Sequence, residues 1–329
     1  MNSNNPLKDL SACNGRSQFT GSAMEFIVPP KAQVVFVSDL FAADYEGGAE
    51  LTSEALLLAD SGPDNFFRVH SASLTVDMLN KNKDKTWIIA NFTHCNISVL
   101  NYLPISNINY YLIEYDYKYC MYRSEVMHKM QTKQDCDCFV KPYGKMVELL
   151  HKNSQRVFWM SEAQKNHFHT RLPSLKEEES NNPHNVVIGS IFKNEDLDFL
   201  MELAAERTTA KKLPIEIWAI QNSQNWIKGT NETSAWCKSE EKVFRLLGGM
   251  PYREFMKALS TCHGLAFRPL DKDTCPRIVI EAKIMGLELA LNDNIQHKDE
   301  AWFGKTPEEI VTHLKTRASL FWSLISYVT

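Results

Sequence analysis

Residues 264–294 read GLAFRPLDKDTCPRIVIEAKIMGLELALNDN and alternate between apolar runs and polar loops. The runs at 264–267 and 287–291 have the length and composition of short buried strands, and residues 278–285 between them are predicted to be helical. A strand, a helix and a second strand in about thirty residues form a βαβ unit with parallel strands. This stretch therefore predicts an α/β fold with parallel sheets.

The same alternation continues toward both ends of the chain. Ser161 is a plausible N-cap residue for the helix that follows it. Further strands are predicted at 34–37, 87–90, 110–115, 156–160, 186–188 and 215–220. Further helices are predicted at 50–60, 162–168, 195–206, 251–259 and 307–328, the last either continuous or broken.

The length of 329 residues suits two domains of about 100–200 residues each. The polar segment KEEESNNP at 176–183 is the best candidate for a linker between them. We therefore predict a first domain at 1–183, a second at 184–312, and a terminal helix at 313–329 that crosses back to the first. Residues 1–30 are predicted to be a loose polar lead-in.

Composition narrows the class of protein. The chain has 36 Lys and Arg against 40 Asp and Glu, a net charge of −4, without the basic excess of most nucleic-acid-binding proteins. Its polar start lacks a signal-peptide core, and no apolar run is long enough for a membrane span. Eight scattered cysteines fit a reduced, cytoplasmic protein, and we interpret the C-x-C pair Cys136 and Cys138 as ordinary thiols, with a metal site as the alternative.

The most informative polar residues are two carboxylates, because Asp273 precedes Glu281 by eight positions. Carboxylates accept hydrogen bonds from the paired hydroxyls of ribose or hexose. Glu281 is predicted to open the helix that follows the polar loop, and a helix N-terminus favours a diphosphate. The alternative is a surface loop followed by an amphipathic helix.

This spacing, together with EAKIMG at 281–286, resembles the E-x7-E region of retaining GT-B glycosyltransferases of family 4, the glycosyl transferases group 1 class. The resemblance implies two Rossmann-like domains whose parallel sheets face a central cleft. It assigns Asp273 a catalytic place near the donor sugar and Glu281 the nucleotide ribose. The first position is Asp here instead of Glu, and the glycine that usually follows it soon after is absent.

A second resemblance lies at the start of the predicted second domain. The sequence VIGS, which includes Gly189 and ends at Ser190, is followed by Lys193 and resembles the strand–glycine–basic loop that holds the donor diphosphate. Lysine binds phosphate as a point charge, so Lys193 is predicted to bind the diphosphate and to act in catalysis. The class usually has arginine where this chain has Ser190. Arg268 or Arg277 is predicted to supply the missing charge, the alternative being a solvated surface arginine.

The predicted first domain offers weaker signals. Gly47-Gly48 follows the first strand and resembles the glycine loop of this class, where glycine lets the backbone approach phosphate and sugar; the alternative is a plain turn. His94 follows a predicted strand at a position where the class often has a histidine facing the cleft. It is predicted to contact the donor sugar or the acceptor, the alternative being a structural histidine.

Two acidic residues, Glu114 and Asp116, end another predicted strand, where side chains of doubly wound sheets face a crevice. They are predicted to orient an acceptor hydroxyl. The alternative is a pair of loop salt bridges with Lys118 or Arg123.

The resemblance implies a metal-independent, retaining glycosyltransferase that needs a nucleotide-sugar donor and no other cofactor. The acceptor stays open between a glycan, a lipid-linked sugar, a protein and modified DNA. One alternative is a phage-type glycosyltransferase acting on DNA bases. Another is a non-catalytic nucleotide-binding or scaffold protein, because a fold does not fix a function.

Overall fold

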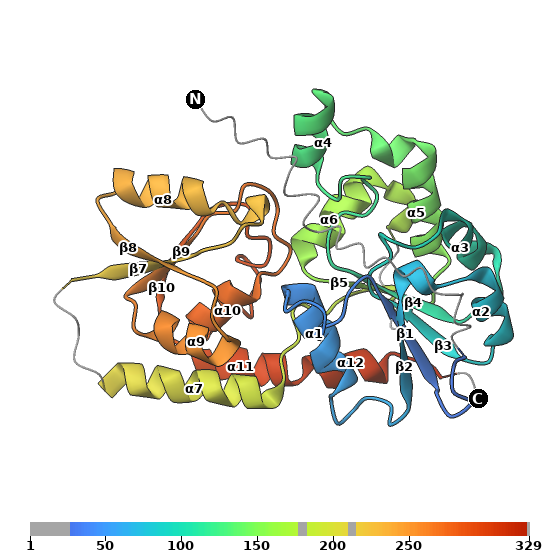
Figure 1. Ribbon diagram of the computed structural model, residues 1–329, viewed down its shortest axis with the longest axis horizontal. Helices are drawn as coiled ribbons and strands as arrows, with labels where there is room; N and C mark the ends of the chain where they lie inside the picture. The colour runs from blue at the N-terminus through green and yellow to red at the C-terminus, as the bar shows by residue number, and fades with distance from the viewer. Residues whose placement is uncertain (1–26, 177–182, 210–214, 328–329) are drawn as a thin grey trace.

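The computed structural model describes residues 27–176, 183–209 and 215–327, and these form two α/β halves that lie side by side (Figure 1). Within the described residues the strands make two sheets. One has six strands in the order β2-β1-β3-β4-β5-β6, and the other has four in the order β10-β9-β7-β8. Every strand pair in both sheets is parallel. The predicted α/β class with parallel sheets is confirmed.

The first sheet has helices on both of its faces. Its strands are β1 (Val34–Ser38), β2 (Phe66–His70), β3 (Thr86–Ile89), β4 (Tyr110–Glu114), β5 (Val157–Trp159) and β6 (Asn185–Val187). The helices of this half are α1 (Gly48–Leu57), α2 (Val76–Lys81), α3 (Ile97–Tyr102), α4 (Glu125–Thr132), α5 (Pro142–Lys152) and α6 (Glu162–Arg171).

Alternate residues of the strands build the two cores. Val34 and Phe36 belong to the core that includes α1, whereas Val35 and Val37 belong to the core on the opposite face. This division follows from the period of two residues in a strand. All of β1 is buried, which explains why its apolar run predicts a strand.

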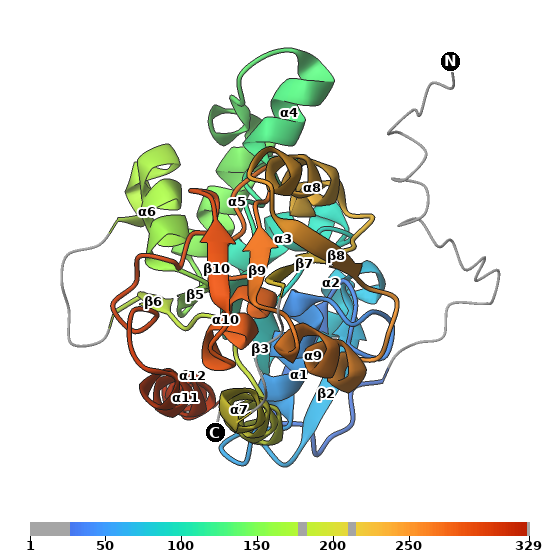
Figure 2. The ribbon, with the colours of Figure 1, turned by 90° about the vertical axis from the view of Figure 1, so that its left-hand side faces the viewer.

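The second half follows the same construction, with β10, β9, β7 and β8 lying next to one another (Figure 2). Its strands are β7 (Ile217–Gln221), β8 (Val243–Leu247), β9 (Gly264–Phe267) and β10 (Glu288–Leu291). Its helices are α7 (Asn194–Thr209), α8 (Thr230–Ser239), α9 (Tyr252–Ser260), α10 (Arg277–Ile284) and α11 (Pro307–Lys315).

Helix α10 agrees with the predicted range 278–285 to within one residue at each end, but the place of Glu281 in it differs from the prediction. Pro276 is its N-cap residue and Arg277 its first helical residue, so Glu281 lies in the second turn and does not open the helix as the sequence analysis predicted. All residues from Arg277 to Ala282 are buried. The alternative of an amphipathic surface helix is therefore wrong.

The chain leaves the first half later than predicted. β6 pairs with β5 and is the last strand of the first sheet, although the sequence analysis placed it in the second half. We therefore propose that the first half runs through β6 and the second begins at α7. Most of the predicted linker, residues 177–182, and residues 1–26 of the predicted lead-in lie outside the described residues.

The end of the chain returns to the first half. The predicted terminal helix is broken at Thr316 into α11 and α12 (Arg317–Ser323). In α12, the indole of Trp322 donates a hydrogen bond of 2.9 Å to the carbonyl of Leu56. Arg317 donates hydrogen bonds to the carbonyls of Ile188, at 3.0 Å, and Val187, where the chain leaves β6. Helix α12 is thus fastened to the first half.

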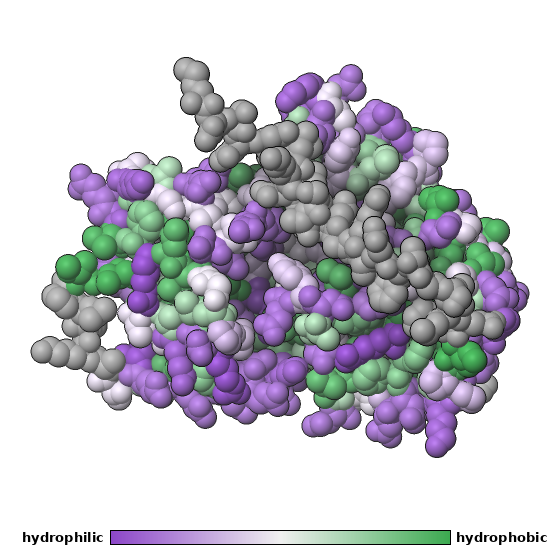
Figure 3. Space-filling view, viewed as in Figure 1, coloured by the Kyte–Doolittle hydropathy of each residue, from purple (hydrophilic) through white to green (hydrophobic). Residues whose placement is uncertain are grey.

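The face in Figure 3 is largely hydrophilic with several hydrophobic patches, one of which lies at its left end over the outer strand β8. Val243 and Leu246 of β8 are exposed there. Among the residues described, none of the helices combines the length and apolarity that a membrane span requires.

Candidate functional site

The loop after β6 lies against the start of α10. The hydroxyl of Ser190 donates a hydrogen bond of 2.7 Å to the carbonyl of Cys275, and the Ser190 amide donates one of 3.3 Å to its sulfur. Gly189 has φ of +69°, a left-handed conformation that favours glycine over residues with a side chain. The turn at Gly189 directs Ser190 toward α10. The structure therefore brings the predicted glycine loop and the predicted helix together.

Arg277 occupies the space between this loop and the first half. Its side chain is 7 % exposed, its Nη1 donates to the carbonyl of Ile191, and its guanidinium lies 3.8 Å from the ring centre of Phe192. A Cβ atom at Gly48, which begins α1, would lie 3.9 Å from the Cδ of Arg277. Arg277 thus reaches the junction of the two halves with a buried positive charge.

The other arginine predicted for this role lies in different surroundings. Arg268 follows β9, and its Nη1 donates a hydrogen bond of 3.1 Å to the carbonyl of Leu291. Its guanidinium lies 4.5 Å from the ring centre of Trp236. Of the two candidates, Arg277 is the one in contact with the loop after Gly189.

Glu281 lies one turn along α10 from Arg277 and is 2 % exposed. The hydroxyl of Tyr252, the first residue of α9, donates a hydrogen bond of 3.1 Å to its Oε1, and the Nε of Arg277 is 3.7 Å from the same oxygen. Burial raises the pKa of Glu281, while Arg277 and the Tyr252 hydrogen bond oppose the rise. Both contacts use the same carboxylate oxygen, Oε1.

Lys193 lies on the loop that follows Gly189 and directly precedes α7. Burial raises the pKa of Asp196, and the positive charges of Arg277 and Lys193 both act against that rise. We call Gly189, Ser190, Lys193, Tyr252, Arg277 and Glu281 the α10 cluster. It combines a helix N-terminus, two cations and a buried carboxylate, a set suited to a phosphate and a sugar hydroxyl.

The N-terminus of α1 faces this junction and holds a carboxylate of its own. A Cβ atom at the N-cap residue Gly47 would lie 2.3 Å from the Oε2 of Glu50, so a residue larger than glycine would fit only if the Glu50 side chain moved. Burial raises the pKa of Glu50, Arg123 opposes the rise, and Asp39 adds to it. The Glu50 carboxylate lies where the resemblance puts a donor phosphate near Gly47-Gly48, and the sequence analysis did not identify it.

Asp273 lies in the loop before α10 and has a cationic partner. Its Oδ2 is 2.7 Å from the Nζ of Lys228, which ends the short helix η6 (Trp226–Lys228). The next residue, Thr274, donates a hydrogen bond of 2.8 Å to the carbonyl of Tyr115, so the loop is docked on the first half. Lys228 was missed by sequence reasoning because 45 residues separate it from Asp273.

His94 and its loop depend on Asp39 at the end of β1. Asp39 accepts hydrogen bonds of 3.1 Å from the amides of Thr93 and His94, and a further one from Ser71. Burial would raise the pKa of Asp39, but these hydrogen bonds outweigh it and hold the pKa below its ordinary value. His94 itself is exposed. Its predicted role stays a prediction.

Glu114 and Asp116, at the end of β4, form ion pairs. Ion pairing was the alternative to their predicted role in orienting an acceptor. Glu114 lies inside the first half, 2.8 Å from Lys118 and 3.1 Å from His151, and all three side chains are buried. The expectation that Glu114 faces a crevice is therefore wrong, because His151 on α5 and Lys118 enclose it. Asp116 lies 3.3 Å from Lys118 and is also paired with Arg123.

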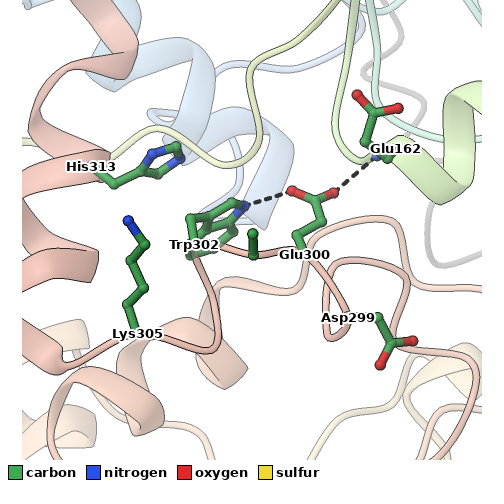
Figure 4. Close-up of a pocket in the computed structure, with 7 residues that line it drawn as sticks. Glu162, Asp299, Glu300, Trp302, Lys305 and His313 are labelled. Carbon is green, nitrogen blue, oxygen red and sulfur yellow. Dashed lines mark hydrogen bonds between the residues drawn. The ribbon is translucent and has the colours of Figure 1, made fainter.

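A cavity of about 570 Å³ opens on another side of the junction (Figure 4). The carboxylate of Glu300 accepts hydrogen bonds from the Glu162 amide at 2.9 Å and from the Trp302 indole at 2.6 Å, which links α6 to the segment before α11. The lining residues are Glu162, Asp299, Glu300, Ala301, Trp302, Lys305 and His313. None of the site residues predicted from the sequence is among those that line this cavity.

Comparisons with known proteins support the fold alone. No protein family model matches the sequence, and no curated protein matches it. Solved structures do match, among them the trehalose-6-phosphate synthase OtsA, with a TM-score of 0.53 and 10% identity over 89% of this chain and 92% of that one. A UDP-forming α,α-trehalose-phosphate synthase from Burkholderia xenovorans has a TM-score of 0.50 and 8% identity over 89% and 92%.

A third match is the E. coli trehalose-6-phosphate protein bound with UDP-2-fluoro glucose, with a TM-score of 0.50 and 11% identity over 88% of this chain and 92% of that one. These matches extend along most of each chain, and OtsA has the GT-B architecture. The chain therefore has the GT-B fold that the sequence analysis predicted. At such low identity the matches carry no activity over to this chain.

Proposed function

We propose that this protein is a glycosyltransferase that moves a sugar from a nucleotide-sugar donor to an acceptor, with the donor bound between the two halves beside the start of α10. The observation that carries this proposal is the α10 cluster, in which Arg277 begins α10 and contacts the loop that carries Lys193, and Glu281 lies one turn further on. The family 4 resemblance of EAKIMG at 281–286 and the GT-B fold are consistent with it.

Each residue of the cluster has a distinct proposed role. Lys193 and Arg277 neutralise the charge that develops on the departing diphosphate, which is stabilisation directed at the transition state and needs no metal ion. When Arg277 turns from the carbonyl of Ile191 toward the diphosphate, it uncovers Glu281 for the ribose hydroxyls. Ser190 holds the loop in place through its hydrogen bond to Cys275, and the positive charge comes from Lys193 and Arg277.

Asp273 is proposed to lie near the donor sugar, with its charge held by Lys228. The docking of Thr274 on Tyr115 keeps this loop against the first half, where the acceptor is proposed to bind. Such contact between halves excludes water, so that the donor is transferred and not hydrolysed. Retention of configuration follows from the resemblance alone.

The test is a thermal-shift screen of the purified protein against UDP, GDP, ADP, CDP and TDP. We expect one of them to raise the melting temperature, and Glu281→Gln to weaken its binding by about tenfold or more, because a hydrogen bond to a charged group contributes about 1.5–3 kcal/mol. Glu254→Gln, an exposed carboxylate on α9, is the matched control and should bind as the wild type does. If none of the five nucleotides stabilises the wild type at millimolar concentration, the donor site is wrong.

Turnover separates an enzyme from a nucleotide-binding scaffold. Once the nucleotide is known, its common sugar conjugates are incubated with the protein, and the released nucleoside diphosphate is measured. A glycosyltransferase releases it slowly to water and faster when the right acceptor is added. A scaffold binds the nucleotide without releasing any product, and that result would contradict the proposed activity while leaving the binding site intact.

A further inference from the structure

Three cysteines and one histidine meet in the first half, away from the α10 cluster. The ligand atoms of Cys120, His128, Cys136 and Cys138 all lie within 4.8 Å of one another. The Nδ1 of His128 is 3.3 Å from the sulfur of Cys138 and 3.8 Å from that of Cys120. All three cysteines are unbridged thiols, and Cys120, His128 and Cys138 are buried.

These side chains come from three successive segments of the chain. Cys120 lies in the turn after β4, where its amide bonds to the carbonyl of Tyr117 at 3.0 Å. His128 lies on α4, whose N-cap Ser124 accepts a hydrogen bond of 2.8 Å from the Met127 amide. Lys133 then ends the helix with φ of +61° and turns the chain back, so that Cys136 and Cys138 return to the histidine.

The donor set is that of a structural zinc site. Zn²⁺ in such sites is held by four ligands, and three thiolates with one imidazole is one of the common sets. In a tetrahedral site with Zn–S bonds of about 2.3 Å and Zn–N bonds of about 2.0–2.1 Å, a nitrogen and a sulfur ligand lie roughly 3.6 Å apart. The two distances from His128 Nδ1 agree with this spacing. A disulfide would use only two of the three thiols and leave the third beside the histidine.

We propose that Cys120, His128, Cys136 and Cys138 bind one Zn²⁺ ion, which fixes the segment between β4 and α5. This proposal does not depend on the proposed transferase activity. It replaces the interpretation of Cys136 and Cys138 as ordinary thiols, since the C-x-C pair finds its two partners only in the folded chain.

The site would stiffen one wall of the junction between the halves. Within the segment, Ser124 donates a hydrogen bond to the carboxylate of Asp271, and Glu125 lies 3.5 Å from the Nζ of Lys272. These two partners directly precede Asp273. The zinc ion would therefore support, from the first half, the loop that carries the proposed sugar-binding carboxylate.

Metal content of the protein tests the proposal directly. The full-length protein is purified without chelator, and its metals are measured by inductively coupled plasma mass spectrometry. We expect one zinc ion per chain in the wild type and at least a tenfold loss in Cys136→Ser. Cys95→Ser is the matched control, because Cys95 is also a half-buried thiol of the first half but lies outside the cluster, and it should keep its zinc. A zinc-free wild type that also takes up none when Zn²⁺ is added would overturn the proposal.

A second measurement covers the case in which Cys136→Ser does not fold. The wild-type protein is stripped of metal under reducing conditions and titrated with Co²⁺ alone. We expect the visible absorption of tetrahedral cobalt and a thiolate-to-cobalt charge-transfer band, both removed by one equivalent of Zn²⁺. An octahedral spectrum without a charge-transfer band, or a disulfide between two of the three cysteines in the native protein, would contradict the site.

Discussion

The Nε of Arg277 lies 3.7 Å from the Oε1 of Glu281, one turn away on α10, and both side chains are buried at the junction of the two halves. The pair gives α10 an internal charge balance in the ligand-free protein. A donor diphosphate that draws Arg277 away would disturb that balance and leave the carboxylate for the ribose. Ligand binding and local stability should therefore respond together to changes at this pair.

Arg277→Met is predicted to destabilise the protein by about 3–5 kcal/mol, because it leaves the buried Glu281 carboxylate without its cation. The double variant Arg277→Met/Glu281→Gln should recover a large part of that loss, since the uncompensated charge is then gone. Chemical denaturation of both variants measures the effect. Arg253→Met, an exposed arginine on α9, is the control. A loss below about 1 kcal/mol for Arg277→Met would show that the pair is not a buried ion pair.

Tyr252→Phe removes the hydroxyl that donates to Glu281. We expect a loss of about 1.5–3 kcal/mol in the free energy of unfolding, because a buried hydrogen bond to a charged group is lost. The pKa of Glu281, already raised by burial, should rise further. Urea denaturation gives the first quantity, with the partly exposed Tyr122→Phe as the comparison. Equal stability of the two variants would rule out the hydrogen bond.

We predict that the folded protein loses stability in mild acid because of His297. The ring is fully buried and stacks on Trp302, neither ring nitrogen has a hydrogen-bond partner among the described residues, and burial lowers its pKa to about 3. A lowered pKa means that the unfolded chain binds the proton more readily than the folded one. Stability is thus complete above the unfolded value near 6.5 and falls as the pH drops from there toward 3, by about 1.4 kcal/mol per pH unit.

His297→Phe should reduce this slope between pH 6.5 and 5. The measurement is the free energy of unfolding at several pH values. Part of the wild-type slope should remain, because burial also lowers the pKa of His313, which stacks on Trp302, to about 4. An unchanged slope in His297→Phe would mean that His297 is not responsible.

Glu114→Ala is predicted to cost about 3–5 kcal/mol, because it removes the carboxylate that neutralises buried Lys118 and accepts from His151. Asp116 also contacts Lys118 and should limit the loss to the lower part of this range. Asp77→Ala breaks an exposed ion pair with Lys81 and should cost less than about 1 kcal/mol. Thermal and urea denaturation of the two variants compare a buried with an exposed pair, and equal losses would contradict the prediction.

The sequence predicts each strand of the described residues except β2 and β8, which lie at sheet edges. β1 is buried along its whole length, so its apolar run is a clear signal. β2 lies at the edge of the first sheet, and its sequence FFRVH mixes apolar and charged residues, which gives neither a continuous nor an alternating pattern. β8 is likewise an edge strand with an internal arginine. Neither was predicted, because the apolar pattern that indicates a strand is interrupted in both.

The candidate site shows a similar limit. Glu281 and Asp273 stand out through their spacing and the motif that follows, whereas their partners Tyr252 and Lys228 lie 29 and 45 residues away in the sequence. Glu50 was missed because an acidic residue in the first turn of a helix is common and carries no signal of its own. The fold, and not local pattern, brings each of these side chains to its place.

In the described part of the chain, the backbone crosses between the halves from β6 to α7 and again from α11 to α12, and Arg317 fastens the second crossing to the first at Ile188. The two segments that connect the halves are therefore held together at one place, which can act as a hinge. A change in the angle between the halves would then pivot near Arg317 and Ile188. The parts of each half that lie farthest from this pivot would move the most. A small change in angle at the pivot would therefore produce a large displacement at the opposite side of the molecule.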